Sequence, residues 1–448
     1  MTRTRGERGP EPDYSGYPPP SDRNGHILRP ALLAAPSRNG RPEYLKELNT
    51  LIVLEMFRNQ GAISRADVAR QTGISAPTVS KVVERLIDAE LLLEEGTGIS
   101  TGGKRPTLLR FNARYGQVLG IDLGGTHLRM AVASLDGSFL STSVEDIDPA
   151  AGPDAILRRI VEAGRAALRA HGERRPIAVG LATPGIVDVD RGMVVAARNL
   201  RGWKQVPVRQ ALAQGFAAPV TVDNDVNLAA VGERWHGAGQ GQDDVVFVSI
   251  GTGIGAGILA GGQVHRGVNF AAGEVNTLPS GVAAEDGQGE LGLEDVASGP
   301  AIVRRAKARG VASADGPLTT DGVFALASAG DRAAGAVIAE AVDALARGIA
   351  GLLASIDPGV VMIGGGVSRQ GDALLEPLRA RLQQMVRLRA RLLRSELGVD
   401  AQLHGAVFAA LRLADESLVA VGRGKSVTAP SPGPSPAARG RGASFNHW

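Results

Sequence analysis

Residues 118–133 have the sequence VLGIDLGGTHLRMAVA, in which two apolar segments flank an acid, two glycines and a threonine. The apolar residues recur with period two, which predicts two strands joined by a tight turn. Gly124 and Gly125 allow positive φ and close backbone approach, so the turn N–H groups and the Thr126 hydroxyl can surround an anionic oxygen. Asp122 would then face a phosphate-bound Mg²⁺. A Gly-Gly turn alone also fits an ordinary β-hairpin.

Two further segments favour the phosphate-binding interpretation. Residues 245–259, VVFVSIGTGIGAGIL, repeat the strand, glycine turn and strand, and a third glycine cluster follows a short apolar strand at 360–363. Two such hairpins in one chain predict two related lobes that face one nucleotide. The nucleotide-binding residues predicted here are Gly251, Thr252, Gly253, Gly364, Gly365 and Gly366.

These motifs carry a family resemblance. DLGGT, GTGIGAG and PGVVMIGGGVSR occur in the order of the two phosphate loops and the adenosine loop of the sugar-kinase, actin and Hsp70 fold. Between them, TVDNDVNLAAVGE at 221–233 resembles the ROK family (repressors, open reading frames and kinases). The resemblance covers roughly residues 45–420 and implies an α/β fold with a two-lobed actin-like ATPase domain. It makes ATP and Mg²⁺ possible cofactors.

The segment after residue 219 predicts a sugar site. An apolar strand at 219–222 ends in Asp-Asn-Asp, where a carboxylate can accept the proton of an attacking sugar hydroxyl and an amide can bind neighbouring hydroxyls. By resemblance to ROK kinases, Asp225 matches the catalytic base and Asn224 a sugar contact. Glu274 and Glu294 match two further sugar-binding carboxylates. The segments 183–185 and 199–203, which include Asn199, resemble loops that close over the sugar.

Two departures from the ROK pattern affect this site. ROK kinases carry a histidine where this chain has Thr277, and a cysteine-rich zinc loop where this chain has PSGVAAEDGQGELG. The sequence therefore predicts no zinc site. Because that loop orders Glu274 and supplies a sugar contact in the family, Thr277 and its surroundings make ligand identity and catalysis doubtful, while the phosphate loops remain intact.

Composition and charge limit the classes of protein. The 448 residues include no cysteine, which excludes disulfides and cysteine zinc ligands, and no apolar run is long enough for a membrane span. A cytoplasmic protein is expected. The net charge of +3 divides into +7 on the tails at 1–42 and 423–448 and −4 on the remainder. Both tails are rich in Pro, Gly, Ser and Arg, which predicts basic disordered segments flanking an effector domain at 113–422.

Residues 43–112 predict a winged helix-turn-helix domain. Ser64 and Asp67 form the pattern of a capping box at the start of a second helix, and Gly73 predicts a turn before a third helix that begins after Ser75. Strands at 91–95 and 107–111 predict a wing. The segment also resembles the N-terminal domain of ROK repressors. The predicted DNA contacts are Ser75, Ala76, Thr78, Lys81, Arg85, Lys104 and Arg105.

Charge leaves an alternative open for this domain. Residues 43–112 contain nine basic and nine acidic residues, so a helical bundle used for protein contacts also fits the sequence. The acids lie mainly outside the start of the recognition helix and the tip of the wing, which favours DNA.

Three functions remain compatible with the sequence. The favoured one is a sugar-responsive transcription regulator, a repressor of carbohydrate genes, that binds operator DNA as a homodimer or homotetramer and responds to a sugar or sugar phosphate. The alternatives are an ATP-dependent sugar kinase with an accessory DNA-binding domain and a scaffold for protein contacts. A kinase has no need of residues 43–112, which is why the regulator is preferred.

Overall fold

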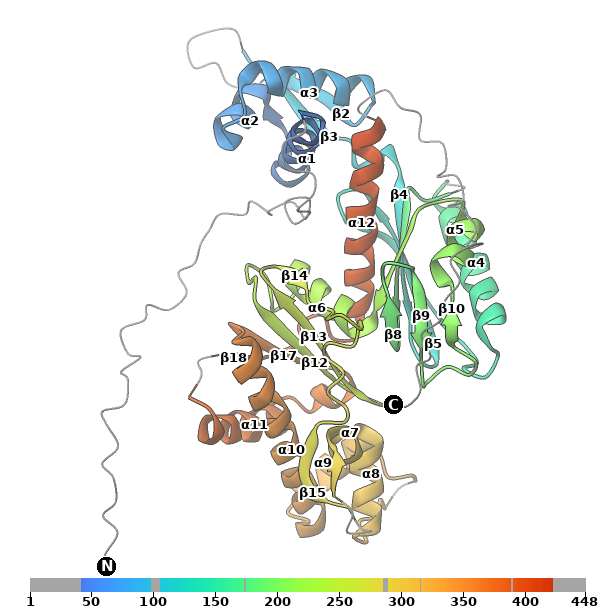
Figure 1. Cartoon of the computed structure of the whole chain (residues 1–448), viewed down its shortest axis with the longest axis vertical. Helices are drawn as coiled ribbons and strands as arrows, with labels where there is room; N and C mark the ends of the chain where they lie inside the picture. Colours follow the sequence, from blue (N-terminus) through green and yellow to red (C-terminus); the bar gives the residue numbers. More distant parts are fainter. Residues whose placement is uncertain are drawn as a thin grey trace, which may run out of the picture.

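The computed structural model describes residues 42–97, 105–172, 175–284, 289–314, 316–387 and 390–421. The chain forms three bodies along one long axis (Figure 1). A small N-terminal domain lies at one end, a first α/β lobe follows it, and a second α/β lobe lies at the other end. Within the described residues, no helix is long and apolar enough to cross a membrane.

The N-terminal domain has the predicted winged-helix architecture. Ser64 caps its second helix and exchanges the two hydrogen bonds of a capping box with Asp67, and Ser75 caps the third helix. That third helix buries Val79, Val82 and Val83 against the first helix and the sheet. The sheet has the strand order β1-β3-β2. The elements are α1 (Pro42–Gln60), β1 (Ile63–Ser64), α2 (Arg65–Thr72), α3 (Ala76–Asp88), β2 (Leu92–Thr97) and β3 (Thr107–Phe111).

The first lobe is built on a five-stranded mixed sheet. The predicted hairpin at 118–133 is present, as β4 and β5, and the sheet order is β11-β7-β4-β5-β6. Two helices cover one face, and the C-terminal helix α12 (Ala401–Val421) covers the other. The elements are β4 (Gln117–Leu123), β5 (His127–Ser134), β6 (Phe139–Asp146), α4 (Pro153–Ala170), β7 (Ala178–Thr183), α5 (Val208–Phe216) and β11 (Val220–Asn224). The side hairpins are β8 (Ile186–Asp188), β9 (Met193–Ala196) and β10 (Lys204–Val206).

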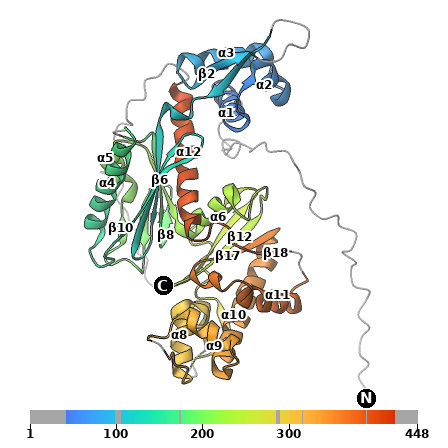
Figure 2. The same ribbon diagram turned by 180° about the vertical axis from the view of Figure 1, so that it is seen from behind.

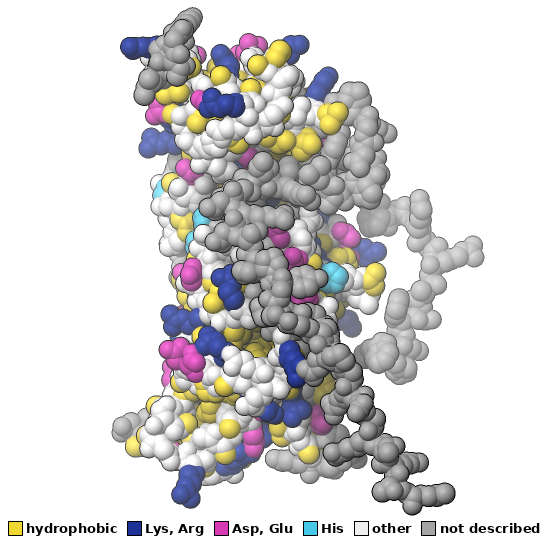
Figure 3. Space-filling model, turned by 90° about the vertical axis from the view of Figure 1, so that its left-hand side faces the viewer, with side chains coloured by type: hydrophobic (Ala, Val, Ile, Leu, Met, Phe, Trp, Pro, Cys, Tyr) yellow, Lys and Arg dark blue, Asp and Glu magenta, His cyan; other side chains and the backbone are white. Residues whose placement is uncertain are grey.

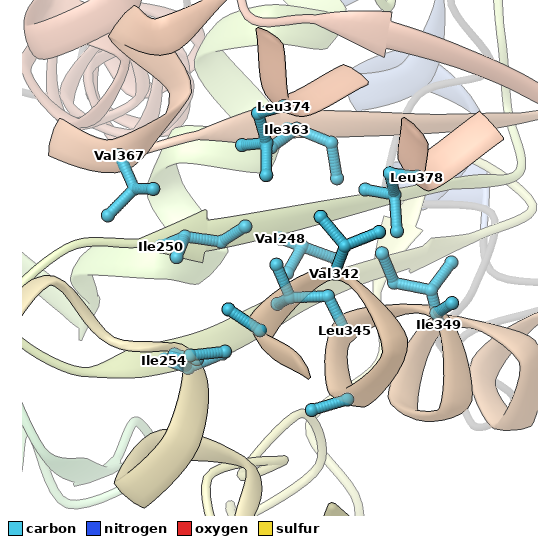
Figure 4. Close-up of a cluster of buried hydrophobic side chains, with 14 of the residues drawn as sticks. Val248, Ile250, Ile254, Val342, Leu345, Ile349, Ile363, Val367, Leu374 and Leu378 are labelled. Atoms are coloured by element: carbon cyan, nitrogen blue, oxygen red, sulfur yellow. The ribbon is translucent and has the colours of Figure 1, made fainter. Parts of the chain in front are cut away.

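The second lobe repeats this plan with the strand order β14-β13-β12-β17-β18. Figure 4 shows its core, where Val342, Leu345 and Ile349 of the long helix α10 face Val248 and Ile250 of the sheet. The sheet contains β12 (Val245–Ile250), β13 (Ile254–Ala260), β14 (Gln263–Val264), β17 (Val360–Gly364) and β18 (Arg391–Arg394). The helices are α6 (Asp225–His236), α7 (Leu293–Ala297), α8 (Gly299–Ala308), α9 (Thr320–Ser328), α10 (Arg332–Ile356) and α11 (Asp372–Met385). A separate hairpin is formed by β15 (Pro279–Ala283) and β16 (Glu290–Gly292).

Two helices lie between the sheets of the two lobes. Helix α12 packs on β4 and β7 of the first lobe, α6 packs on β12 and β13 of the second, and the two helices pack on each other (Figures 1 and 2). Glycine permits the close approach of α12 to β7, because a Cβ on Gly180 of β7 would lie 2.0 Å from the carbonyl oxygen of Ala406 of α12. The helical patterns predicted at 154–170, 206–214, 323–329 and 331–355 match α4, α5, α9 and α10. Helices α6, α7, α8, α11 and α12 were not predicted.

Candidate functional site

Two carboxyl groups of the candidate site lie near enough to interact electrostatically, Asp122 at the end of β4 and Asp225 at the start of α6. Burial raises the pKa of each to about 7. The neighbouring carboxylate of Asp225 raises the pKa of Asp122 further, and Arg129 opposes the shift. For Asp225, a hydrogen bond from the Val226 N–H opposes the shift, while Glu274 adds to it. Such poorly solvated carboxyl groups can bind a cation or accept a hydroxyl proton.

Asn224 is held in place on both sides of its amide. Its Oδ1 accepts hydrogen bonds from the N–H groups of Val226 (2.9 Å) and Asn227 (3.1 Å), which caps α6. Its Nδ2 donates to the carbonyl oxygen of Gly185 at 2.9 Å. The parallel strands β11 and β7 pair Asn224 with Thr183, so their following loops meet at one edge of the sheet. The predicted segment 183–185 therefore lies beside the Asp-Asn-Asp motif.

Asp223 is buried and forms an ion pair that the sequence reading did not predict. Its Oδ2 accepts hydrogen bonds from Nε (3.0 Å) and a terminal nitrogen (2.5 Å) of Arg266. Its Oδ1 accepts from the Asn224 N–H at 2.8 Å and from Asn227 Nδ2 at 3.1 Å. Arg266 follows β14 of the second lobe, so this pair joins the lobes two residues from Asp225. No local sequence signal links two positions 43 residues apart.

The segments of the chain after β14 contain two further predicted sugar contacts, Glu274 and Glu294. Partial burial raises the pKa of Glu274, with Glu294 adding to the shift and Arg198 opposing it. Glu294 accepts a hydrogen bond from the Ile254 N–H at 2.8 Å, and its own N–H donates to the Asn276 carbonyl at 2.9 Å. One oxygen of the predicted sugar ligand Glu294 is thus bound to the second glycine loop.

Three predicted sugar contacts, Asn199, Glu274 and Thr277, are exposed. Thr277 lies on the segment whose backbone pairs with residues 292–294, next to Glu294. Among the described residues, no group of three or more His, Cys, Asp or Glu side chains is arranged to hold a metal ion. Residues 285–288 of the predicted zinc-free loop lie outside the described residues.

The glycine loops are assembled as tight turns. The Gly124 N–H donates to the His127 carbonyl at 2.8 Å, which leaves Thr126 exposed at the turn. In the second lobe, the Gly251 N–H donates to the Gly253 carbonyl at 2.9 Å.

The third glycine cluster lies against this second loop. Gly365 has φ +79° and passes so close to β12 that a Cβ would lie 2.5 Å from the Ile250 carbonyl oxygen. A Cβ on Gly251 would lie 3.8 Å from the N atom of Gly366. The structure thus brings two of the three predicted nucleotide loops, 251–253 and 364–366, side by side, with the third on the opposite lobe.

The third helix of the N-terminal domain presents most of the predicted DNA contacts. Ala76 and Lys81 are exposed, and Thr78 is half-buried. Ser75 is partly engaged, because its Oγ accepts the Thr78 N–H at 3.4 Å and lies 2.8 Å from the Thr78 hydroxyl. Arg85 folds back onto its own helix through a 3.1 Å hydrogen bond from Nε to the Lys81 carbonyl. The Ser75 contact is the predicted N-cap of the third helix, whereas the Arg85 contact was not predicted.

The wing is described only in part. Arg105 is exposed just before β3, and the predicted contact Lys104 lies outside the described residues. Figure 3 shows Lys and Arg side chains distributed over the winged-helix end of the molecule, with acidic side chains among them. This mixed surface agrees with the balanced charge of the domain, so the positions of the basic groups matter more than their number.

Comparisons with known proteins define the class. The ROK family profile matches residues 118–412, and a winged helix-turn-helix DNA-binding profile matches residues 48–92. The chain belongs to the ROK family. It carries the two parts of a ROK transcription regulator, an N-terminal winged helix-turn-helix and an actin-like sugar-kinase fold.

Individual relatives include regulators and kinases. The chain is 31% identical to a putative xylose repressor of Caldicellulosiruptor sp. over 76% of its own length and 88% of that protein. It is 35% identical to the glucokinase of Thermotoga maritima over 59% of its length and 87% of that enzyme.

Two solved structures make the same comparison in three dimensions. A ROK family transcriptional regulator, described as a homologue of the E. coli MLC protein, covers 85% of this chain and aligns over 100% of its own, with a TM-score of 0.73 and 26% identity. A ROK glucokinase of Streptomyces griseus, in complex with glucose and AMPPNP, covers 66% of this chain and 99% of its own, with a TM-score of 0.55 and 33% identity. The regulator extends over the winged helix, and the kinase covers a smaller part of the chain.

Proposed function

We propose that this chain is a sugar-responsive transcriptional repressor of carbohydrate genes. It binds a palindromic operator through α3 and the wing, as a homodimer or homotetramer, and binds a sugar or sugar phosphate between its two lobes. Ligand binding changes the orientation of the two lobes relative to each other. This movement changes the spacing of the paired winged helices and so lowers operator affinity.

One observation carries the proposal. The same chain presents Ala76, Thr78 and Lys81 at the start of an outward-facing helix at one end of the molecule, and places Asn224 and Asp225 between two lobes farther along it. A kinase uses only the second feature.

The proposed sugar contacts lie on both sides of the cleft. Asn224 and Asp225 belong to the end of β11 and the start of α6, and the second lobe supplies Glu274 and Glu294. Carboxylates and amides can each bind vicinal sugar hydroxyls. Asn199 and Thr277 complete the proposed set. They are exposed, Thr277 lies on the segment that pairs with Glu294, and Asn199 follows Arg198, which interacts with Glu274.

A sugar kinase is the second candidate, because the residues present also fit Mg²⁺-ATP. The buried Asp122 carboxyl group would hold the metal, and the adjoining glycine loops at 251–253 and 364–366 would hold the nucleotide. When bound, the nucleotide would supply a transferable phosphoryl group. In that case Asp225 would accept the proton of the sugar hydroxyl.

The proposal is tested with the full chain and DNA selected from a genomic fragment library. Operator affinity is measured by fluorescence anisotropy with and without D-xylose, D-glucose and their phosphates. ADP formation is measured in parallel samples that also contain ATP and Mg²⁺. A sugar that weakens DNA binding without ADP formation supports the repressor. Sequence-independent DNA binding that no sugar alters would contradict it.

A further inference from the structure

Helix α12 connects the effector cleft with the DNA-binding domain. It has 21 residues and is therefore about 30 Å long. Figures 1 and 2 show that one end lies against α6, between the two lobes, and the other end reaches α1 of the winged-helix domain. Its apolar face belongs to the same cluster as Val53, Leu54 and Phe57 of α1. One continuous helix thus contacts both functional parts.

The cleft end of α12 is held against α6 without intervening side chains. A Cβ on Gly232 of α6 would lie 2.2 Å from the Ala401 carbonyl oxygen, and one on Gly405 would lie 1.8 Å from the Leu228 carbonyl oxygen. Helix α6 begins at Asp225. Because the two helix backbones touch, a displacement of α6 by a bound ligand moves α12 as well.

The segment that precedes α12 is also hydrogen-bonded to α6. The buried Glu233 of α6 accepts hydrogen bonds from the N–H groups of Leu397 (3.0 Å) and Ala238 (2.8 Å) and from the Ser395 hydroxyl. From the other lobe, Arg129 donates a hydrogen bond to the Val399 carbonyl. Residues of both lobes therefore form hydrogen bonds with the segment just before α12.

The far end of α12 meets α1 through four charged residues. Asp415 binds Arg58 with two hydrogen bonds, of 3.2 and 2.5 Å. Arg412 binds Glu55 at 2.7 Å and lies 3.9 Å from Asp415. The Asp415 side chain is only 3% exposed and that of Arg58 12%. Arg58 also lies over the Phe111 ring, 5.1 Å from its centroid. We call these four residues the α1–α12 joint.

Buried charges of this kind fix geometry more than they add stability. Removing an ion pair from water is costly, and apolar residues of similar volume often stabilise a fold equally well. A bidentate arginine–carboxylate pair, however, adds a geometric requirement that an apolar contact lacks, because both hydrogen bonds form only in one relative orientation of the two side chains. The joint thus holds the winged helix in one orientation on the end of α12.

We propose that α12 transmits movement of the two lobes to the winged helix, and that Glu55, Arg58, Arg412 and Asp415 are the positioning residues that make this transmission effective. The inference rests on the proposed repressor function for its biological role. The claim that the joint fixes the orientation of the winged helix on α12 does not depend on whether a sugar is the effector.

The first experiment measures that orientation without any effector. Because the chain has no cysteine, Asp88→Cys on α3 and Glu162→Cys on α4 introduce two unique spin-label sites, and pulsed dipolar spectroscopy gives their distance distribution. The parent protein should give one narrow distribution. Arg58→Glu places a third acid in the joint and should broaden it, and adding Asp415→Arg restores two acids and two bases and should narrow it again.

A matched control and a fold check accompany these variants. Arg347→Glu reverses a charge in the Arg347–Asp343 pair on α10 of the second lobe, and should leave the distribution unchanged. Should Arg58→Glu fail to fold by circular dichroism, Asp415→Asn, which keeps the side-chain shape, replaces it and should also broaden the distribution. Narrow, unshifted distributions in folded joint variants would overturn the proposal.

The second experiment measures coupling. Operator affinity is determined with and without D-xylose or D-glucose, and sugar binding is measured separately by calorimetry. A sugar effect in the range typical of allosteric proteins, about 5- to 150-fold, should fall to nearly one in Arg58→Glu with sugar affinity retained, and return in the double variant. A full sugar effect in Arg58→Glu would refute coupling through the joint. If the parent protein responds to no sugar, the repressor proposal fails, and the distance measurement still decides the role of the joint.

Discussion

Asp223 at the end of β11 and Arg266 after β14 form an ion pair that crosses from one lobe to the other, with Arg266 donating hydrogen bonds of 3.0 and 2.5 Å to a single carboxylate oxygen. Asp223 also orients Asn224 and Asn227 through its second oxygen. The pair therefore ties lobe position to the geometry of the proposed sugar site.

Replacing Arg266 should weaken both the contact between the lobes and the fixed geometry of the proposed sugar site. Arg266→Met leaves the buried Asp223 carboxylate without its cation, which should lower the free energy of unfolding by about 3 kcal/mol, the lower end of the range for breaking a buried pair. Urea denaturation measures the change. Arg309→Met removes one of the two arginines paired with the partly exposed Glu340 and serves as the control, with a loss below about 1 kcal/mol. Equal losses in the two variants would contradict the special role of the pair.

Two double variants should separate specific from nonspecific DNA binding. Thr78→Ala with Lys81→Ala removes side chains at the start of α3 and should weaken binding to the selected operator far more than to random DNA. Lys104→Ala with Arg105→Ala should weaken binding to all sequences and reduce the salt dependence of affinity, because phosphate contacts release counterions. Anisotropy titrations at several salt concentrations give both quantities. Unchanged binding in both variants would refute the winged helix as the DNA-binding part.

The carboxyl groups of Asp122 and Asp225 should make stability fall as pH rises. Each has a folded pKa of about 7 against 3.8 as the ordinary value, so the folded state holds more protons than the unfolded state between these limits. The contribution of these two groups to the free energy of unfolding therefore decreases from about pH 4 to pH 7. Asp122→Asn should flatten this dependence in thermal melts at fixed ionic strength. The exposed substitution Asp154→Asn should leave the slope as in the parent, and an Asp122→Asn slope equal to that of the parent would exclude this role for Asp122.

Asp225→Asn should separate the repressor from the kinase. The amide keeps the size of the carboxyl group but is a weaker hydrogen-bond acceptor for a ligand hydroxyl and cannot act as a base. Operator binding should therefore persist while the sugar response is impaired. The parent protein should phosphorylate sugars slowly or not at all, because Thr277 replaces a histidine that contacts the sugar in ROK kinases. Misplacement of the attacking hydroxyl by about 1 Å costs on the order of a hundredfold in rate. Rapid ADP formation with a common hexose, abolished by Asp225→Asn, would make the kinase the primary function.

Zinc content tests the interpretation of the loop after Thr277. A structural zinc ion needs about four thiolate or imidazole ligands, and the chain has no cysteine and Thr277 where ROK kinases carry a histidine. Elemental analysis of purified, tag-free protein should find less than one zinc per ten chains. Zinc in a one-to-one ratio, retained through dialysis against a chelator, would show that other residues replace the missing ligands.

The sequence by itself determined the elements whose signals are local. The alternating apolar residues around Gly124 and Gly125 specify the β4–β5 hairpin, and Ser64 with Asp67 specifies the start of α2. In α3, the spacing of Val79, Val82 and Val83 specifies which face is buried. These features depend on neighbours within about one or two turns of chain, so periodicity and capping chemistry reveal them.

Only the tertiary structure decided which distant groups meet. Arg58 and Asp415 are 357 positions apart, and each by itself has the pattern of a surface charge on a helix. Glu294 fits the family pattern of a sugar ligand, yet the fold also places its carboxylate on the Ile254 N–H. Helix α12 lacks a clear polar face because it is covered by the first-lobe sheet, by α6 and by α1, so periodicity gives little sign of it. Such contacts arise from packing of whole elements, and no short stretch of sequence contains both partners.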